Sequence, residues 1–328
     1  MLSILVPAYN VDVQPLVHDL LRQARQLNIP FEIIVEDDAT PDKHWCAENH
    51  TLVMEPEVTY IQNIENIGRA KTRNHLANAA QYPYLLFIDG DAGMKQSDYI
   101  SQYVQYIRFH QHADVPFVVL GGVAYREMTP DPAFRLRWKY GIAREQKTAA
   151  VRNLTPYRSF TPFNMLATKS VFEKVSFDEW FTSYGYEDTF FGDQLRQKGI
   201  PVSHIDNELY HDGIDSNEEY VRKMMGAIDN LAALHRDNRL PEGFVRDNRL
   251  LCTYLKCKRV RMAGVIGLCL RAFRTPLRWL AVRASSLPAL DLLKLGRLME
   301  AQSKQSSAVF RGVLIASQPT SSTRRPTR

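Results

Sequence analysis

Two aspartates flank a glycine directly after a short apolar run, in the stretch YPYLLFIDGDAGMK at residues 82–95. The apolar residues 85–88 predict a buried strand, and Asp89 and Asp91 follow at its carboxyl end. If the chain stays extended there, residues two apart face the same side. Gly90 is expected to let the backbone turn and a ligand approach closely. Two such carboxylates can hold Mn2+ or Mg2+ with open positions for phosphate oxygens, although D-G-D is also common in surface turns.

Further acidic groups occur where other elements are expected to begin or end. The stretch EDDAT ends a second apolar run, and its Asp38 can accept a hydrogen bond from a nucleobase N–H or, together with Thr40, cap a helix. Glu187 and Asp188, in GYEDTFFGD, begin a predicted helix, where the helix dipole favours acids. A carboxylate at that position can instead be a general base that deprotonates an acceptor hydroxyl.

The remaining candidates for binding phosphate or metal are basic and imidazole side chains. The stretch NIGRAKTRN places Arg69, Lys71 and Arg73 in the first two turns of a predicted helix. Cations there can meet phosphate oxygens or form a solvated basic face. His211, in LYHDG, can be a third metal ligand through a neutral ring nitrogen, although a single histidine is usually structural. A metal that bridges a diphosphate would stabilise it as a leaving group.

Strand-like and helix-like runs alternate over the first part of the chain and must position these groups. Strands are expected at 2–8, 31–37, 58–63, 84–89 and 117–122, and helices at 13–27, 68–80 and 97–110. This order predicts βαβ units and an α/β fold with a mostly parallel sheet flanked by helices. Ligands of such sheets bind beyond the carboxyl ends of the strands. A dinucleotide fingerprint and a P-loop are both missing from the sequence, which counts against a dinucleotide enzyme or a P-loop NTPase.

Fewer elements can be predicted for the second part of the chain. Residues 123–160 are rich in Arg, Pro and aromatics and are expected to be irregular. The remaining expectations are a strand and short helix over 163–175, helices at 186–199 and 217–237, and an extended segment at 201–213. The pocket that selects the ligands is expected in roughly 120–185.

Charge divides the chain into two regions. Residues 251–328 carry 15 Lys and Arg and two acids, a net of +13, whereas residues 1–250 carry 26 basic and 34 acidic residues, a net of −8. In 254–300 basic residues alternate with apolar ones, and the longest apolar run, 262–270, is too short for the ~20 residues of a spanning helix. This pattern predicts either helices in an anionic membrane interface or a helical hairpin packed on the body. A disordered tail is expected over 305–328.

The cysteines and the N-terminal residues indicate the cellular compartment of the protein. The four cysteines show neither zinc-site spacing nor a disulfide framework, which suits a reducing cytosol. The N-terminal MLSILVPAYN is expected to be the first strand rather than a signal peptide.

Five motifs, in order, carry a resemblance to a known family: SILVPAYN, IIVEDDAT, ENIGRAKTRN, FIDGDA and GYEDTFF. They resemble the family 2 glycosyltransferases, which have the Rossmann-like GT-A fold of nucleotide-diphospho-sugar transferases. The resemblance covers residues 1–215, so 216–304 is expected to be a basic helical extension. It implies inverting transfer of a sugar from a nucleotide-diphospho-sugar donor, most readily a UDP-sugar, with Mn2+ or Mg2+.

The resemblance also implies roles for individual residues. A nucleoside pocket would be lined by Pro7, Ala8 and Tyr9, with Asp38 on uracil or ribose and Arg73 and Arg69 on the nucleobase or diphosphate. A DxD-type motif would consist of Asp89 and Asp91, with Asp91 on the metal, Asp89 on the ribose or on the metal through water, and His211 completing the metal site. Asp188 would be the catalytic base, and Glu187 would hold the acceptor. Because EDDAT replaces the commoner DDGS, the carboxylate that meets the nucleoside is either Asp37 or Asp38.

The chain lacks the Q-x-x-R-W motif and the multiple spanning helices of processive synthases, so we expect addition of one sugar. The acceptor is expected to be a glycan or lipid-linked molecule of cell-surface polysaccharide biosynthesis, and the location the cytoplasmic face of the cell membrane. Two alternatives are a non-catalytic nucleotide-sugar-binding scaffold and a nucleotidyltransferase, although the latter requires a Gly-rich, Lys-bearing loop where VPAYNVD stands. Nucleic acid is not an expected partner, since no recognised module is present. The oligomeric state is open.

Overall fold

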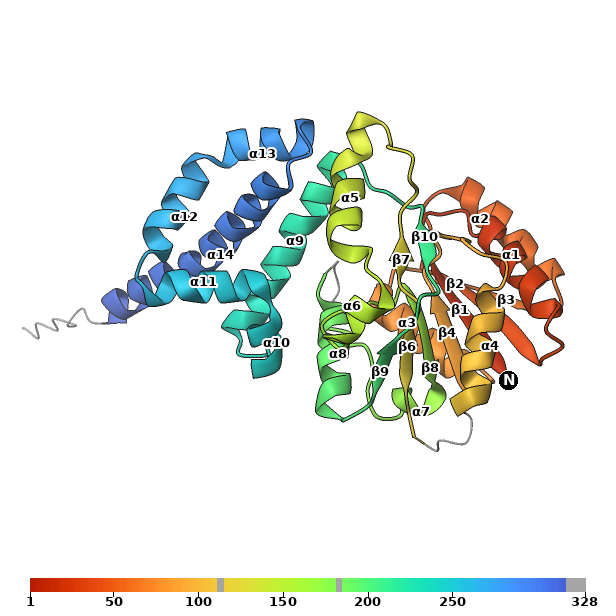
Figure 1. Cartoon of the computed structure of the whole chain (residues 1–328). Helices are drawn as coiled ribbons and strands as arrows, with labels where there is room; N and C mark the ends of the chain where they lie inside the picture. Colours follow the sequence, from red (N-terminus) through yellow and green to blue (C-terminus); the bar gives the residue numbers. More distant parts are fainter. Residues whose placement is uncertain (111–114, 181–184, 317–328) are drawn as a thin grey trace, which may run out of the picture.

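The computed structural model describes residues 1–110, 115–180 and 185–316. A seven-stranded sheet with helices on both faces forms one part, and a group of helices near the C-terminus forms the other (Figure 1). Helix α5 (Arg135–Tyr140) lies between the two parts.

The central sheet has the strand order β3-β2-β1-β4-β8-β6-β9. Strand β8 is antiparallel to β4 and β6, and the other pairings are parallel, so the mostly parallel sheet is confirmed. The bounds are β1 Leu2–Ala8, β2 Phe31–Asp37, β3 Val58–Gln62, β4 Tyr84–Ile88, β6 Val118–Leu120, β8 Asn164–Thr168 and β9 Val202–His204.

Strand β1 lies in the interior of the sheet, between β2 and β4, and is buried on both faces. Ile4 packs in the layer of Leu20, and Leu5 packs on the opposite face in the layer of Leu76. A strand covered on both faces needs apolar residues without alternation, which explains the continuous apolar runs in the sequence. The covering helices are α1 Gln14–Arg25, α2 Lys43–His50, α3 Arg69–Ala79, α4 Tyr99–His110, α7 Lys169–Phe172 and α8 Glu187–Gln197, with a 3₁₀ turn at Thr51–Met54.

A second, small sheet joins three segments that are far apart in the chain. It has the order β5-β10-β7, with bounds β5 Ala92–Gly93, β7 Val123–Ala124 and β10 Leu209–His211. Strand β10 is antiparallel to β5 and opposes His211 to Ala92. This pairing brings the end of β10 to the residues that directly follow β4.

The segment 123–160 was expected to be irregular, and this expectation is wrong in part. Besides β7 it contains a 3₁₀ turn (Pro132–Phe134), α5, a π-helical turn (Gly141–Glu145) and α6 (Ala149–Asn153). These helices are too short to show helical periodicity in the sequence, and their burial comes from tertiary contacts. Leu136, for example, is fully buried in a cluster with Tyr220 of the C-terminal part.

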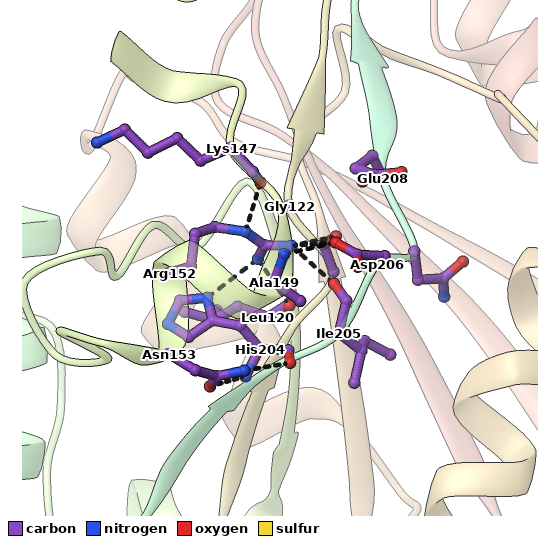
Figure 2. Close-up of polar contacts among 12 residues, drawn as sticks. Leu120, Gly122, Lys147, Ala149, Arg152, Asn153, His204, Ile205, Asp206 and Glu208 are labelled. Carbon is purple, nitrogen blue, oxygen red and sulfur yellow. Dashed lines mark hydrogen bonds and ion pairs between the residues drawn. The ribbon is translucent and has the colours of Figure 1, made fainter.

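Arg152 connects α6 to the sheet and is itself buried (Figure 2). Its guanidinium donates to three carbonyl oxygens at the ends of neighbouring segments, those of Leu120 (3.1 Å), Gly121 (3.2 Å) and Ile205 (2.7 Å). It also lies 3.0 Å from the Nδ1 atom of His204. Because these carbonyls end β6 and follow β9, Arg152 fixes where the two strands stop.

The C-terminal helices pack on one another and on α5. Helix α9 begins after Ser216, whose side chain accepts a hydrogen bond from the Glu219 backbone N–H and so caps the helix. The bounds are α9 Asn217–Arg236, α10 Glu242–Asp247, α11 Arg249–Arg259, α12 Ala263–Ala272, α13 Arg274–Arg283 and α14 Leu287–Ala316.

The predicted disordered tail begins too early. Helix α14 continues to Ala316 instead of ending near 305, and residues 317–328 lie outside the described part of the chain. Among the described residues, none of the helices combines the length and the apolar character needed to cross a bilayer.

Candidate active site

The carboxyl ends of β1, β2 and β4 meet at one edge of the sheet. The Asp38 backbone N–H donates to the Ala8 carbonyl (2.9 Å), and that of Gly90 donates to the Pro7 carbonyl (3.1 Å). Tyr9 follows β1 and is half-exposed. The three N-terminal residues predicted to contact the donor therefore lie beside the D-G-D segment.

Arg73 and Asp89 form an ion pair at this edge. The Nη2 atom of Arg73 donates to Oδ1 of Asp89 at 2.7 Å, and the guanidinium lies 5.5 Å from the centre of the Phe177 ring. Burial alone would raise the pKa of Asp89, but the charges of Arg73 and Arg69 hold it below its usual value. Asp89 is therefore an ionised carboxylate committed to Arg73.

Arg73 also has donor atoms that are not hydrogen-bonded. The residue is only 3% exposed, and its Nε and Nη1 atoms are buried with no partner among the described residues. Leaving buried donors of a charged group unpaired costs free energy, so such donors indicate a ligand oxygen.

The D-G-D segment turns rather than staying extended. The Ala92 backbone N–H donates to the Asp89 carbonyl at 3.0 Å, which closes a tight turn over Gly90 and Asp91. The turn expected at Gly90 is confirmed, the chain is not extended there, and the two carboxylates have different partners. Asp89 faces Arg73, and Asp91 faces the end of β10.

Gly90 is required by the protein's own packing. A Cβ atom there would lie 2.9 Å from the Pro7 carbonyl oxygen and 3.0 Å from Cγ1 of Val13. The close approach of the end of β1 and of Val13 therefore already requires glycine here, and the approach of a ligand stays a prediction.

Asp91 and His211 face each other across the small sheet. The Oδ2 atom of Asp91 lies 4.0 Å from Nε2 of His211, and the Asp91 carbonyl accepts the Asp212 backbone N–H at 3.1 Å. The imidazole is stacked between Phe163 (5.2 Å between ring centres) and Tyr125 (5.9 Å). Its Nδ1 atom is buried with no partner among the described residues, so the rings hold its orientation.

This pair suits a divalent cation, but the predicted set of three ligands is not assembled. Across the described ranges, no three His, Cys, Asp or Glu side chains are grouped as a metal site. Asp89 is engaged by Arg73, which leaves Asp91 and His211. Burial and the charge of Asp89 raise the pKa of Asp91, so a cation would relieve an unfavourable carboxylate. One carboxylate and one imidazole fit Mn2+ or Mg2+ that also binds substrate phosphates.

Asp188 is placed in the first turn of α8. It accepts the Thr189 backbone N–H at 2.6 Å, and burial together with the neighbouring Glu187 charge raises its pKa to about 6. Arg73 is near enough to oppose that shift, so Asp188 belongs to the same charged cluster. Glu187 is buried and turns back to accept the Gly185 backbone N–H at 2.9 Å.

The acids at the end of β2 accept hydrogen bonds from backbone N–H groups. The Asp38 carboxylate accepts the backbone N–H groups of Ile67 (2.7 Å) and Gly68 (2.9 Å), which precede α3. Asp37 accepts the Thr40 backbone N–H at 2.8 Å. Asp38 thus stabilises the entrance to α3 rather than the next helix in sequence, and through it the position of Arg69, at the start of α3.

Sequence reasoning missed the aromatic rings that orient the charged groups. Phe163 and Tyr125 hold His211, and Phe177 lies under Arg73. Arg137, on α5, lies near enough to Asp91 to lower its pKa. The richness of 123–160 in aromatics and Arg was a signal for Tyr125 and Arg137, but Phe163 and Phe177 had none, because single rings carry no spacing pattern.

Comparisons with known proteins agree with the fold. A family model described as "Glycosyl transferase family 2" matches residues 3–175. An uncharacterized glycosyltransferase of Haemophilus influenzae is 34% identical over 93 residues, 28% of this chain and 29% of that protein. Validoxylamine A glucosyltransferase of Streptomyces hygroscopicus subsp. limoneus is 28% identical over 281 residues, 74% of this chain and 58% of that protein. The chain thus matches less than two thirds of the length of these relatives.

Among solved structures, the mannosyltransferase PcManGT from Pyrobaculum calidifontis, in complex with GDP-Man and Mn2+, has a TM-score of 0.55. It is 16% identical, and the match covers 93% of this chain and 86% of that one. At this identity the likeness shows a shared GT-A fold.

Proposed function

The chain belongs to glycosyl transferase family 2, and from that membership we propose an inverting, metal-dependent transfer of one sugar. The donor would be a nucleotide-diphospho-sugar, with UDP-sugars the first to test, and the acceptor a hydroxyl of a glycan or lipid-linked molecule. The observation that carries the proposal is the gathering of the Arg73–Asp89 pair, the Asp91–His211 pair and Asp188 at the carboxyl edge of the sheet.

The donor diphosphate would meet Arg73 and Arg69. The unpartnered Nε and Nη1 atoms of Arg73 can donate to phosphate oxygens while Nη2 stays on Asp89. The nucleoside would lie against Pro7, Ala8 and Tyr9. Asp38 would contact it through lone pairs that the entrance to α3 leaves unused.

Asp91 and His211 would hold Mn2+ or Mg2+ together with the donor's phosphates. When bound, the cation neutralises charge that develops on the departing diphosphate. The mannosyltransferase of similar fold contains Mn2+, which supports the proposal.

Asp188 would be the general base, and Glu187 would orient the acceptor. The pKa of Asp188, about 6, leaves its carboxylate mostly ionised at neutral pH and more basic than that of an ordinary aspartate. The acceptor oxygen would attack the anomeric carbon as the bond to the diphosphate breaks, and its proton would pass to Asp188. One displacement inverts configuration at that carbon.

A lipid-linked acceptor of cell-surface polysaccharide biosynthesis would place the enzyme at the cytoplasmic face of the cell membrane. The net charge of +13 over residues 251–328 supports contact with anionic lipid there. No Q-x-x-R-W motif is present, which supports addition of a single sugar.

Donor hydrolysis tests the proposal. The protein would be incubated with Mn2+ and UDP-, GDP- and dTDP-sugars, and release of free nucleotide would be measured for wild type, Asp91→Asn and Asp188→Asn. We expect hydrolysis of one donor, with loss in Asp91→Asn. Absence of both turnover and metal-dependent nucleotide binding by calorimetry would refute the site.

A further inference from the structure

Helices α12 and α13 form the outer edge of the C-terminal part, with α14 on their inner side (Figure 1). Their inner residues are already packed: Ile266 and Leu270 of α12 join one core cluster, and Ala281 and Val282 of α13 join another. Gly267 lies so close to α14 that a Cβ atom would be 3.3 Å from Met299. The inward faces therefore need no further partner.

The outward side of the same helices carries large apolar side chains in solvent. We call it the docking face and define its apolar members as Val265 (57% exposed), Leu268 (70%), Phe273 (63%) and Trp279 (61%). Single exposed apolar residues are ordinary, but several large ones along two consecutive helices mark an interaction surface.

The charged residues in this stretch of the sequence are all basic. Residues 248–290 contain nine Lys and Arg and no acid. Three arginines of α12 and α13, Arg271, Arg274 and Arg283, are exposed and have no ion pair among the described residues, whereas Arg278 pairs with Glu218. Unpaired arginines beside exposed aromatics are matched by a surface that is apolar inside and anionic outside.

We propose that the docking face inserts its apolar side chains into the interface of an anionic lipid membrane, with the arginines on lipid phosphates. Each helix has 10 residues, which suits a helix lying in the interface plane and excludes one that spans. The inference adds the surface and the depth of contact to the proposed function, and it rests on that function only for the identity of the acceptor.

Other occupants fit the face less well. A second copy of this chain would bring the same positive charge against it, and like charges facing each other oppose association. Nucleic acid would satisfy the arginines but would leave Leu268 and Val265 in water.

Docking would also orient the active site. Asn217, at the start of α9, donates to the Val282 carbonyl of α13 (2.8 Å) and accepts the Leu136 backbone N–H of α5 (2.8 Å). The next residue of α5, Arg137, lies 5.4 Å from the centre of the Tyr125 ring, which stacks on His211. The membrane face and the sugar site are thus joined through packed, hydrogen-bonded elements.

Vesicle flotation of the full chain, without donor or acceptor, tests the inference. Binding would be compared on phosphatidylcholine vesicles and on vesicles that also contain phosphatidylglycerol, at low and high salt. The variants are Arg271→Glu with Arg274→Glu, and Phe273→Ser with Trp279→Ser. Matched controls on the catalytic part are Arg158→Glu and Phe109→Ser, both exposed.

We expect binding to the anionic vesicles, weakened by salt and by at least about tenfold in each docking-face pair, with the controls unchanged. Donor hydrolysis and the melting temperature of all variants should match wild type, so loss of vesicle binding is separable from loss of the proposed chemistry. Equal binding to neutral vesicles, or docking-face variants that bind like wild type, would overturn the inference. If sedimentation showed that the wild type is a dimer and that these variants are not, the inference would be overturned in favour of a second copy of the chain on this face.

Discussion

The Nε2 atom of His211 lies 4.0 Å from Oδ2 of Asp91, although the two residues belong to distant parts of the chain. The pairing of β5 with β10 produces this approach, and two aromatic rings fix the imidazole plane. The smaller sheet thus completes a site that the parallel sheet begins.

Replacing His211 by Ala should weaken Mn2+ binding by about tenfold or more, because one of the two proposed protein ligands is removed. Calorimetry with Mn2+ and a nucleoside diphosphate would measure it, and donor turnover should fall by about 10²-fold. The control is His18→Ala, an exposed histidine on α1 that should behave as wild type. Unchanged Mn2+ affinity in His211→Ala would exclude the imidazole as a ligand.

Replacing Arg73 by Met should lower kcat/KM by about 10²-fold, because the developing charge on the diphosphate loses its buried donors. It should also destabilise the fold by about 2 kcal/mol, since Asp89 keeps its charge without a partner but is a quarter exposed. Lysine at this position should recover stability more than activity, because an ammonium cannot bond Asp89 and a phosphate in the same geometry. Urea unfolding and steady-state kinetics measure the two effects, and equal recovery of both would contradict the donor role.

The rate of sugar transfer should rise with pH through about pH 6, where Asp188 loses its proton. A general base must be deprotonated, so protonation below that pH removes activity. Asp188→Asn should abolish this limb of the profile and reduce kcat by about 10²–10⁴-fold. The same variant should melt at a higher temperature at neutral pH, because burial disfavours the ionised carboxylate. If the rate of Asp188→Asn still rose through about pH 6, the titration would belong to another group.

Gly90→Ala should destabilise the protein by about 1–3 kcal/mol, because the added methyl group meets the Pro7 carbonyl and Val13. The matched substitution is Gly226→Ala, in the exposed interior of α9 with nothing within 4 Å of the new atom. That change should stabilise by about 0.5–1 kcal/mol through helix propensity. Chemical denaturation of both variants would compare them, and equal effects would show that contacts at Gly90 are not limiting.

Arg152→Leu should destabilise the protein by about 3–5 kcal/mol, because several carbonyl oxygens around it lose their donor in a buried position (Figure 2). Arg158→Leu, nearby and exposed, should stay within about 0.5 kcal/mol of wild type. Thermal unfolding monitored by circular dichroism measures the difference.

Much of the fold could be predicted because its signals are local. The apolar runs of β1, β2 and β4 and the helical periodicity of α1 follow from burial on one or two faces. Helix α5 could not be predicted, because Leu136 is buried against Tyr220 and other residues of the C-terminal part, which lie far away in the sequence.

The residue types along the chain are enough to show which chemistry is available: aspartates after β4, arginines in α3, acids at the start of α8 and a basic C-terminal region. How these groups are paired depends on the tertiary structure. It committed Asp89 to Arg73, left Asp91 for His211, and turned Asp38 toward the backbone before α3. Carboxylates of identical type take different roles because each role depends on the partners that chain crossings bring within a few ångströms, and spacing along the sequence does not encode those crossings.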